Sequence, residues 1–244
     1  MEDIAVKTIG ELVAEDYRTA AVFKKYEIDF CCNGNRSIEE ACSYNNTTIE
    51  EVKSEIRLVM ESSVNGTNKI NDFASWPLDL LVSYIEKKHH RYVTTRTPLL
   101  KEYLDKLCKV HGEKHPELIE INSLFSGAAA ELSAHMKKEE QVLFPFIMKM
   151  VAAREEKART FSTPFGSVQN PISTMMQEHD TEGQRFRKIK ELSGNYMPPP
   201  DACNTYRVAY ALLHEFEDDL HLHIHIENNI LFPKALQLEA TFAA

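Results

Sequence analysis

The sequence predicts an all-α protein whose larger part is an antiparallel four-helix bundle. Its 244 residues include only 8 Gly and 10 Pro, which favours long helices over a turn-rich β architecture. From residue 78 onwards, apolar residues recur at spacings of three and four, as on one face of an amphipathic helix. Short breaks separate these stretches, and helices joined by short connections pack as antiparallel neighbours.

The first 62 residues form a separate unit in this prediction. They contain short helical patterns, and Thr48 just before Glu50 and Glu51 has the character of a helix start. The stretch SSVNGTNKIND that follows is polar and contains Gly and Asn, which is typical of a linker. The predicted organisation is a small helical domain at 1–62, a linker at 63–72 and a bundle domain at 73–244.

Four helices are predicted within the bundle domain. Pro98 is expected to kink or end the first, and loops at 160–171 and 193–201 follow the second and the third. The four apolar stripes are Leu78, Leu81, Val82, Ile85, Tyr92 and Val93; Leu118, Ile121, Phe125, Ala128, Leu132, Val142 and Phe146; Ile172, Met175, Met176, Phe186 and Ile189; and Leu212, Phe216, Leu220, Ile230 and Leu231.

Composition and charge exclude several classes of protein. Acidic residues outnumber Lys and Arg by 37 to 28, and the basic residues form no run, so nucleic acid is not an expected partner. No apolar stretch approaches the roughly 18 residues of a membrane span, and the start Met1-Glu2-Asp3 is acidic, so no membrane partner is expected and the predicted location is cytoplasmic. Five cysteines, an odd number, argue against a disulfide scaffold.

One pattern occurs twice in the bundle domain. His-x-x-x-Glu-x-x-[Val/Ile]-Leu-Phe-Pro begins at His135 and again at His223. His90 lies 45 residues before His135, and His179 lies 44 residues before His223. The bundle is therefore predicted to consist of two helical hairpins, each with a His on its first helix and His-x-x-x-Glu on its second.

Helical periodicity turns both His-x-x-x-Glu pairs inwards. His135 and Glu139 fall on the apolar stripe of the second helix, and His223 and Glu227 fall on that of the fourth. Burying an ionised carboxylate costs several kcal/mol unless it is paired or bound to a metal. No Lys or Arg lies on these stripes near the carboxylates, so a cation between the helices is predicted.

The donor types narrow the choice of metal. Imidazoles and carboxylates together suit iron, manganese or zinc, and the absence of Cys at these positions argues against a structural zinc or an iron–sulfur cluster. With His179 and one His of the first helix, the set has more donors than one ion takes. We therefore expect two metal ions bridged by Glu139 and Glu227.

Some positions keep an alternative. A single inward His is most often a hydrogen-bonded core residue, and it is the duplication that favours the ligand interpretation. On the first helix, periodicity centres His89 on the apolar stripe, whereas the hairpin spacing slightly favours His90. His221 and His225 project to the opposite side of the fourth helix and are predicted to face solvent.

Five motifs in one order resemble the Repair of Iron Centers proteins, the di-iron proteins of iron–sulfur cluster repair. The motifs are KKYEIDFCCNG (24–34), SAHMKKEEQVLFP (133–145), PISTMMQEHD (171–180), PPPDAC (198–203) and HIHIENNILFP (223–233). The resemblance implies a hemerythrin-like four-helix bundle attached to a small helical amino-terminal domain, with two iron ions as cofactors.

The resemblance also implies a metal-ligand set, which is His90, His111, His135, Glu139, His179, His223 and Glu227. It places the ligand of the first helix on His90 rather than His89. It places another on His111, which has no counterpart in the second copy; the competitor His115 is expected to be a loop residue. Three histidines would then hold one iron and two the other, leaving a position open for a diatomic ligand.

Cys31 and Cys32 match the vicinal pair of the same family and are candidate catalytic thiols. The alternative is one buried Cys with an accidental neighbour. The resemblance favours redox chemistry or the holding of iron in transit. Thiolate reactivity needs electropositive surroundings, for which the nearby candidates are Lys24, Lys25 and Arg36. The other cysteines lack metal-type spacing and are expected to be packing residues: Cys42, Cys108 and Cys203.

By resemblance, the chain helps to restore iron–sulfur proteins damaged by nitric oxide or oxidants, either by donating iron or by removing nitric oxide. The alternatives are an enzyme that reduces nitric oxide to nitrous oxide and, less favoured because of the attached cysteine domain, a hemerythrin-like oxygen carrier or sensor. Expected partners are damaged iron–sulfur proteins, with nitric oxide or O2 as a small ligand. The chain is expected to be a monomer or a homodimer.

Overall fold

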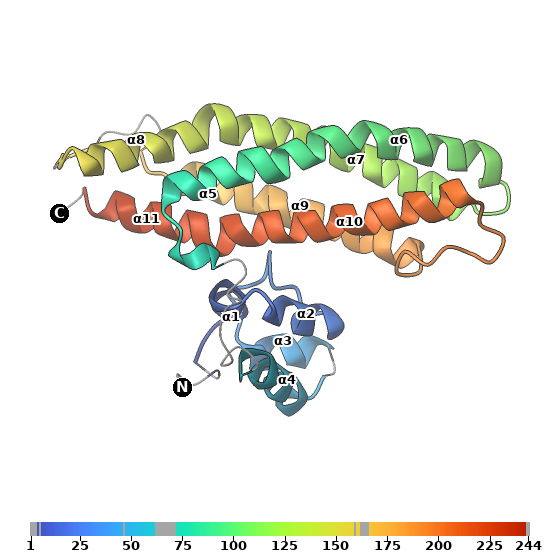
Figure 1. The fold of residues 1–244 in the computed structure, drawn as a ribbon, viewed down its shortest axis with the longest axis horizontal. Coiled ribbons are helices and arrows are strands. Elements are labelled where there is room, and N and C mark those ends of the chain that lie inside the picture. The colour runs from blue at the N-terminus through green and yellow to red at the C-terminus, as the bar shows by residue number, and fades with distance from the viewer. Residues whose placement is uncertain are drawn as a thin grey trace.

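The computed structural model describes residues 4, 6–45, 47–61, 72–158, 160–161 and 166–242. In this part of the chain the regular structure is helical, and the only β-type pairing is an isolated bridge between Thr8 and Ser37. Figure 1 shows a long bundle of helices with a small helical domain beside it. The predicted all-α class is confirmed.

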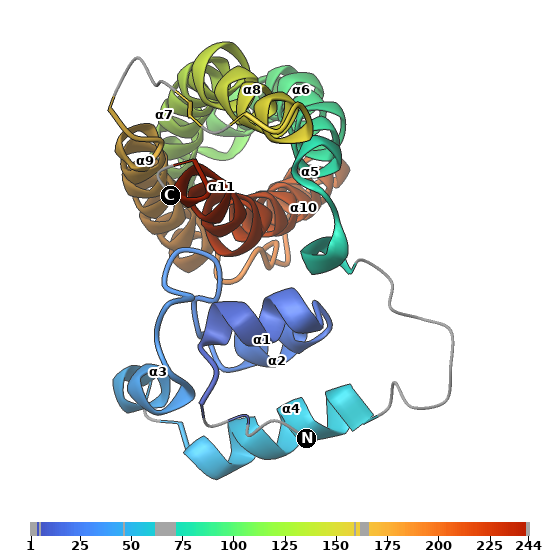
Figure 2. The ribbon, with the colours of Figure 1, turned by 90° about the vertical axis from the view of Figure 1, so that its left-hand side faces the viewer.

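The small domain consists of α1 (Ile9–Glu15), α2 (Thr19–Lys25), α3 (Ile38–Asn45) and α4 (Ile49–Glu61). A capping box starts α1: the Thr8 hydroxyl accepts the Glu11 N–H, and the Glu11 carboxylate accepts the Thr8 N–H. The loop between α2 and α3 carries Cys31 and Cys32. In Figure 2 the small domain packs against one side of the bundle, and this loop reaches the bundle next to α9.

Two glycines allow the small domain to approach the bundle closely. The N–H of Gly10 donates to the carbonyl of Gly34 at 2.7 Å, which ties the loop to α1. A Cβ added to Gly10 would lie 2.3 Å from Oδ1 of Asn229, and one added to Gly34 would lie 2.7 Å from the same atom. Only a residue without a side chain permits contact at this distance.

The described part of the bundle forms four rods of helix (Figures 1 and 2). In chain order they are α5 (Leu78–Tyr84), η2 (Ile85–His90) and α6 (Arg91–His111); α7 (Glu117–Lys138), η3 (Glu139–Leu143) and α8 (Phe144–Glu155); α9 (Gln169–Leu192); and α10 (Asn204–Ile226), η4 (Glu227–Leu231) and α11 (Phe232–Ala240). A 3-10 turn, η1 (Phe73–Ser75), precedes the first rod. Pro98 lies inside α6 and does not end it.

Three of these rods contain a π-helical turn, namely η2, η3 and η4. In η3 the N–H of Phe144 donates to the carbonyl of Glu139, five residues earlier, and in η4 Phe232 donates in the same way to Glu227. A proline follows each Phe, and its ring would clash with the carbonyl four residues earlier in a regular α-helix. A wider turn relieves that clash. The repeated Leu-Phe-Pro therefore shapes the helix directly after each Glu.

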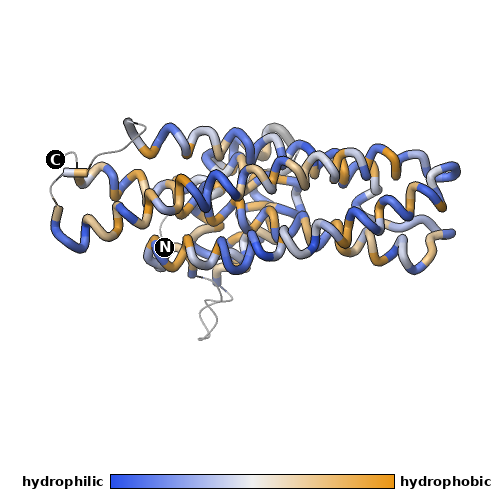
Figure 3. The backbone as a smooth tube through the Cα atoms, turned by 90° about the horizontal axis from the view of Figure 1, so that it is seen from above, coloured by the Kyte–Doolittle hydropathy of each residue, from blue (hydrophilic) through white to orange (hydrophobic). Residues whose placement is uncertain are grey.

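Two apolar clusters fill the bundle on either side of a buried polar layer. In one, Phe186 stacks on Phe216 with ring centroids 5.6 Å apart, and Phe125 meets Phe216 edge-on at 5.3 Å. The other contains Phe144 and Phe232, from the two Leu-Phe-Pro segments. Figure 3 shows hydrophilic and hydrophobic positions alternating along the helices. The histidines and glutamates of the duplicated motif lie between these clusters.

Within the described ranges, no helix combines the length and the apolar character needed to cross a membrane. All of the predicted linker except Asp72 lies outside the described residues. The domain bounds 1–62, 63–72 and 73–244 therefore stay a prediction.

Candidate metal centre

Histidines and glutamates from all four rods meet in the polar layer. They come from η2, α7, η3, α9, α10 and η4, and none is more than 3% exposed: His90, His135, Glu139, His179, His223 and Glu227. In the described part of the chain they form two overlapping groups whose donor atoms all lie within 4.8 Å of one another. The first group, side A, has the imidazoles of His90 and His223; the second, side B, has those of His135 and His179. Both groups contain Glu139 and Glu227.

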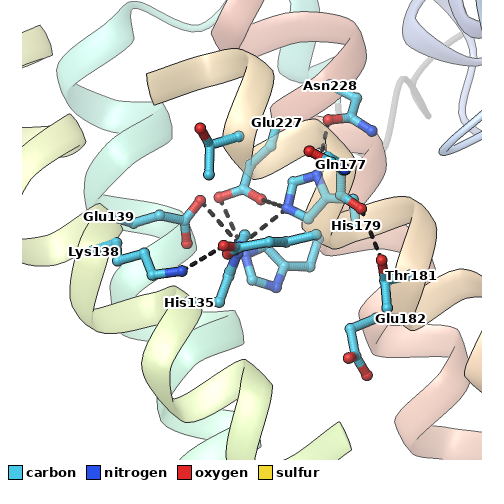
Figure 4. Close-up of polar contacts among 12 residues, drawn as sticks. His135, Lys138, Glu139, Gln177, His179, Thr181, Glu182, Glu227 and Asn228 are labelled. Carbon is cyan, nitrogen blue, oxygen red and sulfur yellow. Dashed lines mark hydrogen bonds and ion pairs between the residues drawn. The ribbon is translucent and has the colours of Figure 1, made fainter. Parts of the chain in front are cut away.

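Each carboxylate offers one oxygen to each side. Glu139 places Oε2 3.3 Å from Nε2 of His90 and Oε1 3.3 Å from Nε2 of His135. Glu227 places Oε1 3.2 Å from Nε2 of His223 and Oε2 3.1 Å from Nε2 of His179. Figure 4 shows the side B imidazoles facing these two carboxylates. This is the arrangement needed for two bridging carboxylates between two ions.

Most of the donor atoms have no hydrogen-bond partner in the part of the chain that the structure describes. Among the described residues, all four oxygens of Glu139 and Glu227 lack a hydrogen-bond partner, as do Nε2 of His90 and Nε2 of His223. On side B, Nε2 of His135 and Nε2 of His179 lie 3.0 Å apart. Buried polar atoms are almost always satisfied in folded proteins. The donors therefore fit cations, because two metal ions would satisfy carboxylates and imidazoles together.

Groups outside the donor set fix the imidazole rings. Nδ1 of His90 lies 2.7 Å from Glu140, and Nδ1 of His135 lies 2.8 Å from Glu178. Nδ1 of His179 lies 2.8 Å from Oδ1 of Asn228, a residue that was not predicted from the sequence to belong to the site. Since a carboxylate can only accept, the first two imidazoles donate from Nδ1 and keep Nε2 for a cation.

The electrostatics of the site favour positive charge. Burial alone would lower the pKa of His135, but Glu139, Glu227 and Glu178 raise it to about 9. Burial alone would raise the pKa of Glu227, but His223 and His179 hold it well below its usual value. A metal ion entering the site would take the place of protons held by these groups.

The two sides differ in their surroundings. A cavity of about 120 Å³ adjoins side B and is lined by both imidazoles of that side and by Glu131, Lys138, Glu178 and Glu182. On side A, His223 stacks on His89 with ring centroids 5.3 Å apart. Each side also has one imidazole stacked on a Phe: His90 on Phe144 at 5.7 Å and His179 on Phe232 at 6.1 Å.

Glu182 was not predicted as part of the site. It is buried, burial raises its pKa to about 7, and Nη1 of Arg185 lies 3.1 Å from its carboxylate. Its position one helical turn after His179 was the only signal for it in the sequence.

The structure brings His90, and not His89, together with the other donors. His89 is buried, but its Nδ1 lies 3.0 Å from Asp219 and it belongs to neither donor group. Helical periodicity favoured His89 because it assumed a regular α-helix from Leu78 onwards. The π-helical turn η2 adds one residue to that turn and so rotates His90 onto the inner face.

The structure does not bring His111 to the other donors. His111 ends α6, and 21 residues of helix separate it from His90, a distance of about 30 Å. Its Nε2 lies 3.3 Å from Sγ of Cys203. His115 lies in the connection after α6, as expected, with Nε2 3.1 Å from Asp201. The predicted set with three imidazoles on one iron is therefore not the one that the structure assembles.

Contrary to the prediction that both face solvent, His225 is buried and His221 is half-buried. The His225 ring lies 5.8 Å from the rings of both Tyr17 and Phe30, and the His221 ring lies 6.1 Å from that of Phe30. The small domain covers this side of α10. Burial lowers the pKa of His221 to about 4 and that of His225 to about 3.

The vicinal cysteines sit where the small domain meets α9. Their sulfur atoms lie 3.8 Å apart as free thiols, and Sγ of Cys32 lies 3.5 Å from the carbonyl of His179. Asp29 accepts the backbone N–H of Cys31 at 3.1 Å and that of Cys32 at 2.9 Å. In the described residues Asp29, Cys31 and Cys32 form a third group whose donor atoms are close enough to hold a metal ion.

Two of the three basic residues expected near the thiols pair with carboxylates elsewhere in the described structure. A hydrogen bond with Cys32, together with burial, raises the pKa of Cys31 well above its usual value. Lys24 pairs with Asp218, and Lys25 pairs with Glu55. The bundle adds positive charge to this region: Arg187 of α9 donates to Asp29 at 2.9 Å, and with Lys24 and Lys190 it lines a cavity beside Cys31.

The fold and the donor set define a cation-binding bundle of the hemerythrin type. Residues 82–235 match the family model of the hemerythrin HHE cation binding domain, and residues 5–59 match ScdA_N, a domain of unknown function (DUF542). The iron-sulfur cluster repair protein YtfE of Yersinia pestis (strain Pestoides F) is 32% identical over 237 residues, which cover 97% of this chain and 100% of that protein. YtfE of Escherichia coli O8 (strain IAI1) is 32% identical over 228 residues, which cover 93% and 96%. The chain belongs to this family of iron–sulfur cluster repair proteins, which confirms the resemblance.

Proposed function

We propose that this chain is a non-haem di-iron protein that helps to repair damaged iron–sulfur proteins by donating iron to them. The observation that carries the proposal is the pair of buried carboxylates, each with one oxygen toward each pair of imidazoles. The names of the relatives support the repair role.

In this proposal His90 and His223 hold one iron, His135 and His179 hold the other, and Glu139 and Glu227 bridge them. Iron would supply redox chemistry and a binding position for a small diatomic molecule. Glu140, Glu178 and Asn228 keep the imidazoles oriented. The two apolar clusters exclude water from the layer, which strengthens the attraction between the carboxylates and a cation.

Iron is also the cargo, and side B is the side from which it would leave. The cavity beside His135 and His179 gives that side a path, and Cys32 lies against the backbone of His179. Thiolates are good iron ligands, but a protonated Cys31 competes weakly for a cation. Cys31 would therefore take iron only when a client or a base removes its proton.

Iron content tests the centre directly. After anaerobic reconstitution with Fe(II), the wild-type chain is expected to hold two irons, and the Glu139→Ala/Glu227→Ala variant fewer than one. His111→Ala is the control and should keep two, because His111 lies outside the donor groups. Fewer than one iron in the wild-type chain, or full iron in the double variant, would exclude the di-iron assignment.

Donation is tested by transfer of iron to a cluster-depleted iron–sulfur enzyme, and Cys31→Ser/Cys32→Ser should slow it. Nitrous oxide is measured in parallel after nitric oxide is added to the reduced protein. More than one turnover per site without loss of iron would replace donation by nitric oxide reduction as the function.

A further inference from the structure

One buried amide joins the small domain to a candidate metal ligand. Asn228 follows Glu227 in η4 and lies between His179 and residues 29–33, which we call the thiol loop. Its Nδ2 donates to the carbonyl of Cys31 at 3.2 Å, and its Oδ1 lies 2.8 Å from Nδ1 of His179. Figure 4 shows Asn228 beside the His179 ring. A single side chain thus connects the backbone of the small domain to an imidazole of side B.

Hydrogen-bond chemistry determines how this amide is oriented. The Cys31 carbonyl can only accept, so it requires the NH2 group of Asn228. The amide oxygen then faces His179, which must donate from Nδ1. Nε2 of His179 is left unprotonated, and this is the atom 3.1 Å from Glu227. The thiol loop therefore holds His179 in the tautomer that a cation at side B requires.

A second contact places the thiol loop against the same turn of α9. Sγ of Cys32 lies 3.5 Å from the carbonyl of His179. Gly183, one turn further along α9, leaves room for this sulfur, because a Cβ there would lie 3.2 Å from it. A large side chain at this point would occupy the space of the Cys32 sulfur and so displace Cys32 from α9.

In the described part of the chain, no such hydrogen bond joins the other three imidazoles to the small domain. Glu140 and Glu178, which hold His90 and His135, both belong to the bundle. Asn229 also docks the thiol loop, donating to the carbonyl of Phe30 at 3.2 Å, but its side chain bonds to His225 and not to a candidate ligand.

We propose that Asn228 is a positioning residue that makes the grip of His179 on the side B iron depend on docking of the thiol loop. The inference rests on the proposed di-iron function. When the loop moves off α9, the amide loses the partner that orients it, and His179 is free to rotate or change tautomer. The side B iron then leaves faster, while the side A iron is retained. A client that engages the thiol loop would thereby trigger release at the adjacent side.

The first test measures iron release to an Fe(II) chelator from the full chain loaded with two irons. Asn228→Ala should release one of its two irons about 10–100-fold faster than wild type, the usual effect of losing such a support. The matched control is Asn229→Ala, which loses a bond to the same loop but none to a ligand, and it should change release by less than about threefold. Mössbauer spectra should show one altered iron in Asn228→Ala and none in Asn229→Ala. Asn228→Asp keeps an acceptor for His179 and should restore slow release.

The second test asks whether the loop acts through Asn228. Gly183→Leu should displace Cys32 and speed release of one iron, and in the Gly183→Leu/Asn228→Ala double variant the two effects should not multiply. Multiplied effects, or unchanged release in Asn228→Ala from a protein holding two irons, would overturn the inference and leave the di-iron proposal intact. A wild-type chain with fewer than one iron would overturn both. Circular dichroism of each variant separates misfolding from loss of positioning.

Discussion

Side A and side B share both carboxylates, and each takes one His from each helical hairpin, so the donor atoms are equivalent. A Phe of a Leu-Phe-Pro segment stacks on one imidazole of each side, Phe144 on His90 and Phe232 on His179. The sides differ in that His223 of side A also stacks on His89, whereas side B adjoins a cavity and contacts the small domain through Asn228 and Cys32. In the proposed di-iron centre, the duplicated residues would hold the two ions, and residues without a counterpart in the other hairpin would determine which ion is accessible.

The largest expected effect is a loss of iron when one imidazole is removed, in separate variants, from side A or from side B. His90→Ala and His135→Ala should each reduce the iron content from two to one, because each leaves the other side with its four donors. The irons that remain should differ: the chelator should remove the one in His90→Ala at least about tenfold faster, since it occupies side B. Iron analysis and stopped-flow chelation measure both quantities.

The two variants serve as controls for each other. Each loses one buried imidazole of the same layer, so a general loss of packing should affect both equally. Equal release rates for the two remaining irons would show that the difference in surroundings does not control access.

Most of the donor set followed from the sequence because it depends on helical spacing alone. His135 with Glu139, and His223 with Glu227, stand one turn apart, and a regular helix places both members on one face. The choice between His89 and His90 failed on periodicity because the π-helical turn η2 lies between the apolar stripe and the ligand. A helical-wheel projection assumes 3.6 residues per turn and therefore does not account for the extra residue of a π-helical turn.

The carboxylates that orient the imidazoles provide a second, smaller test. Glu178→Gln should weaken iron binding at side B by about tenfold, because it removes the charge that supports His135. Glu140→Gln is the matched change on side A and should have less effect, since Glu140 is 45% exposed and Glu178 is 30% exposed. Competition with a chelator of known affinity measures both. A larger loss of iron affinity in Glu140→Gln than in Glu178→Gln would show that side A, and not side B, depends more on its supporting carboxylate.

Contacts made across the fold could not be predicted from spacing. His221 and His225 lie on the outer face of α10, and only the packing of the small domain makes that face an interior. Asn228 follows a predicted ligand in sequence, but its orientation depends on a hydrogen bond to the carbonyl of Cys31, which lies 197 residues earlier. His111 is the opposite case, a predicted ligand that the fold keeps away from the other donors. It lies at the far end of α6, about 30 Å from His90, and no local sequence pattern reveals that distance.

The smallest expected effect concerns Glu182, a buried carboxylate of the side B cavity that belongs to neither donor group. Burial raises its pKa from 4.5 to about 7. A carboxyl group with a raised pKa stabilises the fold only while it is protonated, so this contribution is complete below pH 4.5 and is lost as the pH rises through 7. Glu182→Gln should therefore stabilise the protein at pH 8, by about 1–2 kcal/mol, because it removes a buried charge that Arg185 offsets only in part.

Thermal unfolding at two pH values measures this effect. At pH 8 the melting temperature of Glu182→Gln should exceed that of wild type by roughly 2–8 °C, and at pH 4.5 the two should agree. Glu131→Gln is the matched control, because Glu131 pairs with the same Arg185 but is 57% exposed and has a lowered pKa, chiefly through its hydrogen bond from Arg185. It should bring no gain at pH 8. If Glu182→Gln lowered the melting temperature at pH 8, the charged Glu182 carboxylate would stabilise the fold at that pH. The contrast drawn between Glu182, buried without a cation, and the candidate metal ligands Glu139 and Glu227 would then be wrong.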